Sequence, residues 1–348
     1  MLGRSGMGEK AAMSKMERIK AALAGQPVDL VPISFWGHNY LKEWTPQGLA
    51  EAMLEFQQKY DWDYMKVNPR ASYFVEDWGC KFQPSGDPYM SPTSIDYAVK
   101  STQDWAQLEV LDPQKGVLAE HLYALQLISE GLRGEVPFVQ TVFSPLTIAD
   151  YLVGRQNESL LTYLREDPQS LHQGLAVIAE TYAKYVQLCL ERGVSGIFFA
   201  ISGWASRDLL TEEEYAEFGL RYDLKVLTAI HDGAFFNILH ICGNNIYFDL
   251  LASYPVQVIN WTVTLPGNPS LREGLHRTDK AVMGGVDQNT TLKDGSPEQV
   301  VAEVCRAIEQ TQGLRLFLAP GCSISLQVPE TNLRVARRAR DDFGAGKC

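Results

Sequence analysis

Short apolar runs alternate with longer amphipathic stretches along almost all of the 348 residues, and this alternation constrains the fold more than any other feature. The runs that predict strands are residues 30–36, 63–69, 137–143, 196–201, 235–242, 257–263, 281–287 and 315–322. Strands separated by helices are typical of α/β proteins, and eight of them predict a single-domain (β/α)8 TIM barrel. A doubly wound open sheet is the alternative. It is disfavoured because Trp36, Gly37 and His38 stand at the end of the first run, where such a sheet carries a glycine-rich phosphate-binding turn.

Helix start signals separate the predicted strands. Thr211 and Ser296 each stand three residues before Glu or Gln, which is the capping-box pattern, and Asp167 with Pro168 begins a long helical pattern. Residues 70–134, between the second and third strands, are predicted to be an elaborated segment of the barrel rather than a second domain. Residues 1–14 are predicted to be a disordered tail, so the barrel domain is expected to cover 15–348.

Charge and composition exclude several classes of protein. The net charge is −11 and the isoelectric point is about 5.1, which disfavours nucleic acid and anionic membranes as partners. No segment approaches the roughly 18 continuous apolar residues of a transmembrane helix. The cysteines are scattered rather than densely spaced as in a secreted disulfide framework. We therefore expect a cytoplasmic protein; the sequence leaves open whether it forms a homodimer.

Two of the predicted strands end in residues that bind metals. His240 and Cys242 end the run 235–242, and Cys322 ends the run 315–322. Residues i and i+2 of a strand project to the same face, and a barrel brings both strand ends to the face that carries active sites. One imidazole and two thiols suit zinc, and three protein ligands leave a fourth coordination position for catalysis. The alternative is that these are ordinary buried residues, since Cys often behaves as a small hydrophobe.

The chain resembles the uroporphyrinogen decarboxylase superfamily from about residue 16 to 343, and within it the zinc-dependent methyltransferases that move methyl groups between a corrinoid protein and a thiol such as coenzyme M. The segments that carry the resemblance are 18–32 (RIKAALAGQPVDLVP), 144–151 (SPLTIADY), 239–244 (LHICGN), 284–287 (GGVD) with 292–300, 319–324 (APGCSI) and 329–333 (PETNL). The resemblance implies that His240, Cys242 and Cys322 bind Zn²⁺ and that a partner protein supplies a corrinoid.

The chain differs from the true decarboxylases at two places. It has FWGHNY at residues 35–40, where the decarboxylases carry an Arg-rich loop that grips porphyrinogen carboxylates, and Cys322 where they carry a histidine. Porphyrinogen decarboxylation is therefore not expected. Two further differences leave the substrate open: Leu30 replaces the commoner Arg at the start of the first strand, and the end of the fourth strand has no carboxylate.

Further residues are expected around the metal. A thiol in the fourth position would be held as thiolate, which is the nucleophile that methyl transfer needs. Tyr151, which aligns with a tyrosine of the decarboxylases, is predicted to contact substrate, and Asp287 either to orient His240 or to cap the following turn. Arg70 is expected to pair with a substrate carboxylate or sulfonate, or to form a surface ion pair. The residues expected to line the mouth of the barrel, or to pack beneath it, are Trp36, His38, Tyr73, Trp204 and Asn260.

Three functions fit these residues. The leading one is a zinc-dependent methyltransferase that activates a thiol and transfers a methyl group to or from a corrinoid protein or a methylated small molecule. The second keeps the zinc but forms or cleaves a carbon–sulfur bond, or decarboxylates a small acid. The third is a non-enzymatic barrel that docks a corrinoid partner around a structural zinc. A fourth protein ligand would favour the structural role, and an open position would favour catalysis.

Overall fold

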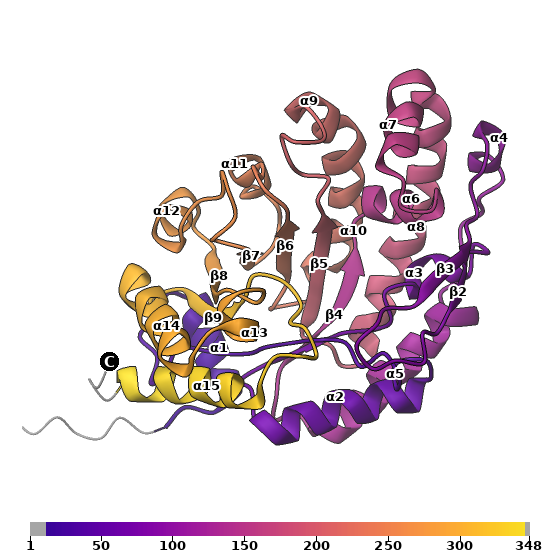
Figure 1. The fold of residues 1–348 in the computed structure, drawn as a ribbon. Helices are drawn as coiled ribbons and strands as arrows, with labels where there is room; N and C mark the ends of the chain where they lie inside the picture. The colour runs from indigo at the N-terminus through magenta and orange to yellow at the C-terminus, as the bar shows by residue number, and fades with distance from the viewer. Residues whose placement is uncertain (1–11, 345–348) are drawn as a thin grey trace, which may run out of the picture.

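Seven parallel strands form a curved sheet in the order β1-β4-β5-β6-β7-β8-β9 in the computed structural model, which describes residues 12–344 (Figure 1). The strands are β1 (Met65–Val67), β4 (Phe138–Phe143), β5 (Gly196–Ser202), β6 (Ile238–Cys242), β7 (Val258–Trp261), β8 (Ala281–Val286) and β9 (Leu316–Pro320). Each of these strands pairs with the one that follows it in the sheet order, and all lie within the predicted runs to within one residue. The predicted barrel is confirmed.

The predicted first strand, 30–36, closes the barrel as an irregular segment. Ser34 N donates to Leu318 O at 3.1 Å, and Leu318 N donates to Pro32 O at 2.8 Å, which joins the segment to β9. On the other side Asp63 N donates to Ile33 O at 3.0 Å. The prediction of a regular strand here was wrong: only isolated bridges form, at Ile33 and Gly37. One reason is that Pro32 has no N–H to contribute to a ladder.

Helices follow the strands around the outside of the barrel (Figure 1). The helices are α1 (Lys15–Leu23), α2 (Pro46–Tyr60), α3 (Tyr73–Glu76), α4 (Thr102–Trp105), α5 (Gly116–Leu132), α6 (Pro145–Leu152), α7 (Asn157–Glu166), α8 (Pro168–Glu191), α9 (Glu212–Tyr215), the π-helix η1 (Ala216–Leu220), α10 (Arg221–His231), α11 (Phe248–Leu251), α12 (Leu271–Arg277), α13 (Thr291–Asp294), α14 (Pro297–Thr311) and α15 (Glu330–Gly344). The predicted starts are confirmed, because Thr211 and Ser296 form capping boxes and Asp167 caps α8. None of the helices in the described range is both long and apolar enough to cross a membrane.

The elaborated segment between β1 and β4 contains α3, α4, α5 and an antiparallel hairpin of β2 (Lys81–Gln83) and β3 (Thr93–Asp96). The hairpin and α4 lie at the edge of the molecule (Figure 1). Asp77 holds the start of α5, since its two carboxylate oxygens accept from Val117 N at 2.9 Å and Leu118 N at 3.0 Å. Tyr182 of α8 donates its hydroxyl to Phe74 O at 3.0 Å, so the segment packs against the barrel helices.

Apolar side chains fill the inside of the barrel as well as the layer between strands and helices. Tyr64, Phe236 and Phe317 meet edge to face or tilted inside it, with ring centroids 5.4–5.8 Å apart. The inner and outer clusters are separate, as expected when successive strand residues face opposite sides. The interior is therefore a packed support for a site at the carboxyl ends of the strands.

The amino end of the barrel is fastened by a buried ion-pair network. The Asp63 carboxylate accepts from Arg18 Nη1 at 2.6 Å, from Arg340 Nη1 at 2.7 Å and from Ile33 N at 2.9 Å. Most of the predicted tail, residues 1–11, lies outside the described residues. Of the remainder, Ser14 caps α1.

Candidate active site

His240, Cys242 and Cys322 meet at the carboxyl face of the barrel. Their possible donor atoms all lie within 4.8 Å of one another, although β7 and β8 separate β6 from β9 in the sheet. A tetrahedral zinc with Zn–S distances of about 2.3 Å places its donors about 3.8 Å apart, so a small adjustment suffices. Within residues 12–344, no fourth His, Cys, Asp or Glu joins the group. The donor set therefore fits a three-ligand zinc site.

Asn260, in β7, determines which nitrogen of His240 can bind a metal. Its Oδ1 lies 2.7 Å from His240 Nδ1, while its Nδ2 donates to Met283 O and Pro320 O, both at 3.1 Å. Because the two carbonyls orient the amide, its oxygen faces the imidazole, and Nδ1–H must be the donor. The Nε2 atom of His240 is left as the metal-binding atom.

A hydrogen bond between the Cys242 and Cys322 thiols shifts their two pKa values in opposite directions. The hydrogen bond from the Cys242 thiol, with a further one from His240, holds the pKa of Cys322 well below its usual value. The same Cys242–Cys322 bond, together with burial, raises the pKa of Cys242. Metal ligation requires thiolates, so one of the two sulfurs is already prepared for it.

A cavity of about 280 Å³ lies beside these three residues, and Trp36, His38 and Tyr151 are among the residues that line it. Trp36 packs edge to face on Phe198, with ring centroids 5.4 Å apart. The Tyr151 ring packs on Phe74 at 4.7 Å. Trp36, Phe198 and Tyr151 thus form aromatic walls of the cavity.

His38 forms a pair with a buried carboxylate. Its Nδ1 lies 3.0 Å from Glu43 Oε2, and its ring stacks on Tyr40 at 5.1 Å. Glu43 is only 1% exposed. The pair fixes the His38 ring at the edge of the cavity.

The other residues expected at the mouth lie elsewhere. Arg70 does not line the cavity, because Glu76 accepts from its Nε at 2.7 Å and its Nη2 at 3.1 Å. Tyr73 is fully buried and its hydroxyl donates to Thr141 O at 2.6 Å. Trp204 is also buried, with only 1% of its surface exposed. Asn260 lies behind His240 rather than at the substrate.

Asp287 caps a turn, which was the second of the two roles considered. It accepts from Thr264 Oγ1 at 2.6 Å and from the backbone N–H groups of Asn289 and Thr290 at 2.9 and 2.8 Å. The expectation that it orients His240 is corrected, since Asn260 does so. A carboxylate at the end of a strand finds the free N–H groups of the following turn first.

Lys66, in β1, is a cavity residue that the sequence analysis missed. It is buried, hydrogen-bonded to Asn68 Oδ1, and its Nζ lies 4.8 Å from the centroid of the Phe198 ring. Burial lowers its pKa to about 7, although the nearby charges of Cys322 and Glu43 act in the opposite direction. The strand period was the available signal, because Lys66 and Asn68 are two residues apart and so face the barrel interior together.

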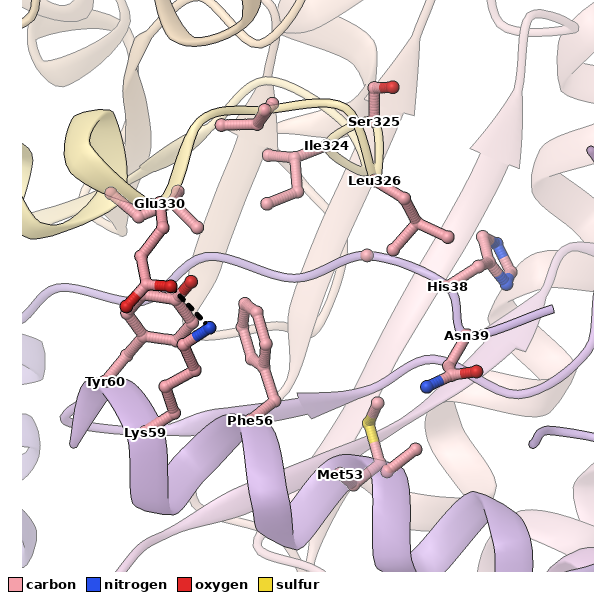
Figure 2. Close-up of a pocket in the computed structure, with 14 residues that line it drawn as sticks. His38, Asn39, Met53, Phe56, Lys59, Tyr60, Ile324, Ser325, Leu326 and Glu330 are labelled. Atoms are coloured by element: carbon pink, nitrogen blue, oxygen red, sulfur yellow. Dashed lines mark ion pairs between the residues drawn. The ribbon is translucent and has the colours of Figure 1, made fainter. Parts of the chain in front are cut away.

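Two further cavities adjoin the metal cavity. One, of about 270 Å³, shares His38 with it and is mainly apolar (Figure 2). Figure 2 shows Met53, Phe56 and Leu326 around this space, with the Lys59–Glu330 ion pair at one end and His38 at the other. The second, of about 610 Å³, shares Ser202 with the metal cavity and is lined mainly by polar residues.

A parallel barrel with a cavity and candidate metal ligands at its carboxyl face defines the class of TIM-barrel proteins that act at that face. The family model "Uroporphyrinogen decarboxylase (URO-D)" matches residues 14–343, so the chain belongs to this family.

Relatives and a solved structure agree with this assignment. The chain is 23% identical over 338 residues to a methylcobamide:CoM methyltransferase of Methanosarcina acetivorans, covering 91% of this chain and 95% of the relative. It is 29% identical over 216 residues to a uroporphyrinogen decarboxylase of a Polaromonas species, covering 59% of this chain and 56% of the relative. A methyltransferase from Methanosarcina mazei has the same fold, with a TM-score of 0.81 at 24% identity and coverage of 95% and 99% of the two chains.

Proposed function

We propose that this protein is a zinc-dependent methyltransferase that transfers a methyl group between a thiol and a corrinoid protein or another methylated small molecule. One observation carries the proposal: three soft and borderline donors converge beside a cavity at the barrel mouth, and no fourth protein ligand joins them in the described part of the chain. That arrangement favours a catalytic zinc over a structural one. The methylcobamide:CoM methyltransferases among the relatives support corrinoid-linked methyl transfer.

Zinc would supply the positive charge that keeps a bound thiol sulfur deprotonated at neutral pH. The residues of the chain would do the rest. Cys242 and Cys322 would offset the metal charge and keep the substrate sulfur electron-rich, and Asn260 would hold His240 with Nε2 toward the metal. The walls formed by Trp36 and Phe198 would keep water from the reacting methyl group.

Tyr151 would contact the substrate as a hydrogen-bond donor. It lines the cavity, and burial raises the pKa of its hydroxyl despite the opposing charge of Arg155. The hydroxyl therefore keeps its proton at neutral pH. The proposal also includes a cytoplasmic location, which the scattered cysteines of the sequence favour.

A matched pair of cysteine variants tests the proposal. Zinc-loaded protein is mixed with methylcobalamin and a panel of thiols, and demethylation of the corrinoid is followed by its absorbance while zinc is measured by elemental analysis. Cys322→Ala should lose both zinc and activity. Cys189→Ala, a change at a buried free cysteine in α8, should keep both. Full zinc content in Cys322→Ala, or inactivity of the wild type with every thiol, would contradict the proposal.

A further inference from the structure

The polar cavity beside the metal cavity is lined by a carboxylate that has one oxygen without a hydrogen-bond partner. Asp150, near the end of α6, lines this cavity and is only 7% exposed. Its Oδ1 is buried and has no hydrogen-bond partner. An unsatisfied buried carboxylate oxygen costs free energy, so its presence calls for an explanation.

The nearby charge of Arg155 and a hydrogen bond from Trp204 only partly offset the burial of this carboxylate, whose pKa stays raised. Arg155 lines the same cavity, but its guanidinium lies over the Tyr151 ring, 4.8 Å from the centroid, and forms no ion pair with Asp150. Glu158, an exposed residue at the same cavity, adds a second negative charge. Of the charged side chains that line the cavity, two are therefore acidic and one is basic.

The polar cavity borders the metal cavity. Ser202, at the end of β5, lines both cavities and pairs in register with Cys242 of β6. Tyr151, the residue after Asp150, lines the metal cavity. A small thiol with its sulfur at the metal site could extend past Ser202 and place its other end near Asp150.

The apolar cavity, which shares His38 with the metal cavity, offers no such site. Its two charged lining residues, Lys59 and Glu330, are already paired at 2.6 Å, and apolar side chains dominate the rest (Figure 2). A charged substrate group would lose its hydration there without gaining a counter-ion. The apolar cavity therefore offers no counter-ion for a charged substrate group.

We propose that the polar cavity binds an ammonium group of the thiol substrate, with Asp150 as its counter-ion. The substrate would then be an amino thiol rather than a purely acidic thiol. An ammonium would donate to the Asp150 carboxylate and add to the charge of Arg155, which offsets this carboxylate only in part. Burial raises the pKa of Asp150 to about 6, so the carboxylate is ionised at pH 7.5 and above. This inference rests on the proposed function, because it assumes that a thiol binds at the metal.

Three thiols with the same two-carbon spacer test the inference: cysteamine, 2-mercaptoethanol and 2-mercaptoethanesulfonate. Their dissociation constants are measured by calorimetry on the zinc-loaded full-length protein at pH 7.5, and zinc content is checked afterwards to exclude metal removal by cysteamine. Cysteamine should bind at least about tenfold more tightly than 2-mercaptoethanol, the ratio expected for one charge-assisted hydrogen bond, and the sulfonate should bind most weakly.

Asp150→Asn should reduce the preference for cysteamine over 2-mercaptoethanol by at least about tenfold relative to the wild type, and Glu158→Gln, a change at the exposed rim, should leave most of the preference intact. The ratio is taken within each variant, so it does not depend on the fraction of folded protein. Equal binding of the three thiols by the wild type, or an unchanged ratio in Asp150→Asn, would overturn the ammonium site and leave the proposed function standing. Failure of all three thiols to bind would overturn the proposed function and, with it, this inference.

Discussion

Replacing Asn260 with alanine should weaken zinc binding without touching a metal ligand. The side chain is fully buried and makes three hydrogen bonds, to His240 Nδ1 at 2.7 Å and to the carbonyls of Met283 and Pro320 at 3.1 Å each. The hydrogen bond behind a ligating histidine typically contributes 10- to 100-fold to metal affinity, or about 1.4–2.7 kcal/mol. Loss of the three bonds should also lower the free energy of unfolding by roughly 2–4 kcal/mol.

Competition for zinc with a chromophoric chelator at neutral pH measures the first effect, and urea unfolding of the zinc-free protein measures the second. Asn237→Ala is the matched control, because Asn237 is equally buried and accepts from Ile197 N at 3.0 Å at the opposite end of β6. It should lose stability and keep its zinc affinity.

Asn260→Asp separates the two effects further. The carboxylate would still accept from His240 Nδ1 but could not donate to the two carbonyls, so zinc affinity should stay close to that of the wild type while stability falls. Unchanged zinc affinity in Asn260→Ala, or an equal loss in the Asn237 control, would refute the role given to Asn260.

Substitutions of two buried carboxylates, Asp150 and Asp63, should change the free energy of unfolding in opposite directions. Burial raises the pKa of Asp150 in the folded protein to about 6, above its usual 3.8, so ionisation of this carboxyl destabilises the fold. The protein with neutral Asp150 therefore has its full stability below pH 3.8 and loses part of it as the pH rises through 6. Asp150→Asn should therefore raise the free energy of unfolding at pH 8 by up to about 3 kcal/mol and have little effect at pH 3.5, measured by denaturant unfolding; a pH-independent effect would contradict this. Asp63→Asn should lower stability by about 3–5 kcal/mol, because the buried guanidinium groups of Arg18 and Arg340 lose their shared carboxylate. Its zinc affinity should not change, since Asp63 lies at the amino end of the barrel; a parallel loss of zinc would mean that the two ends are coupled.

The metal centre was accessible to sequence analysis because it depends on backbone periodicity. His240 and Cys242 share a strand face whatever surrounds them, and a barrel collects all its strand ends at one rim. The position of Cys322 within 4.8 Å of the pair follows from the same two rules. Lys66 could have been predicted in the same way, because it stands two residues before Asn68 and therefore shares its face of the strand.

The partners of side chains were not accessible in this way. Asn260 lies on β7 and Asp287 directly follows the neighbouring β8, and the choice between them as the partner of His240 depends on separations of a few ångströms that no sequence pattern encodes. Arg70 pairs with Glu76 because of how the segment after β1 turns back into α3. The irregular strand at 30–36 could have been anticipated from Pro32.

Zinc K-edge X-ray absorption, recorded with and without cysteamine, tests the central claim most directly. The proposal requires two sulfur neighbours at about 2.3 Å and one imidazole nitrogen in the free protein, and a third sulfur after the thiol is added. Cys322→Ala, if it retains any zinc, should show one protein sulfur fewer. A zinc environment that already holds four protein donors, or that gains no sulfur at saturating thiol, would contradict the assignment of this site to thiol activation.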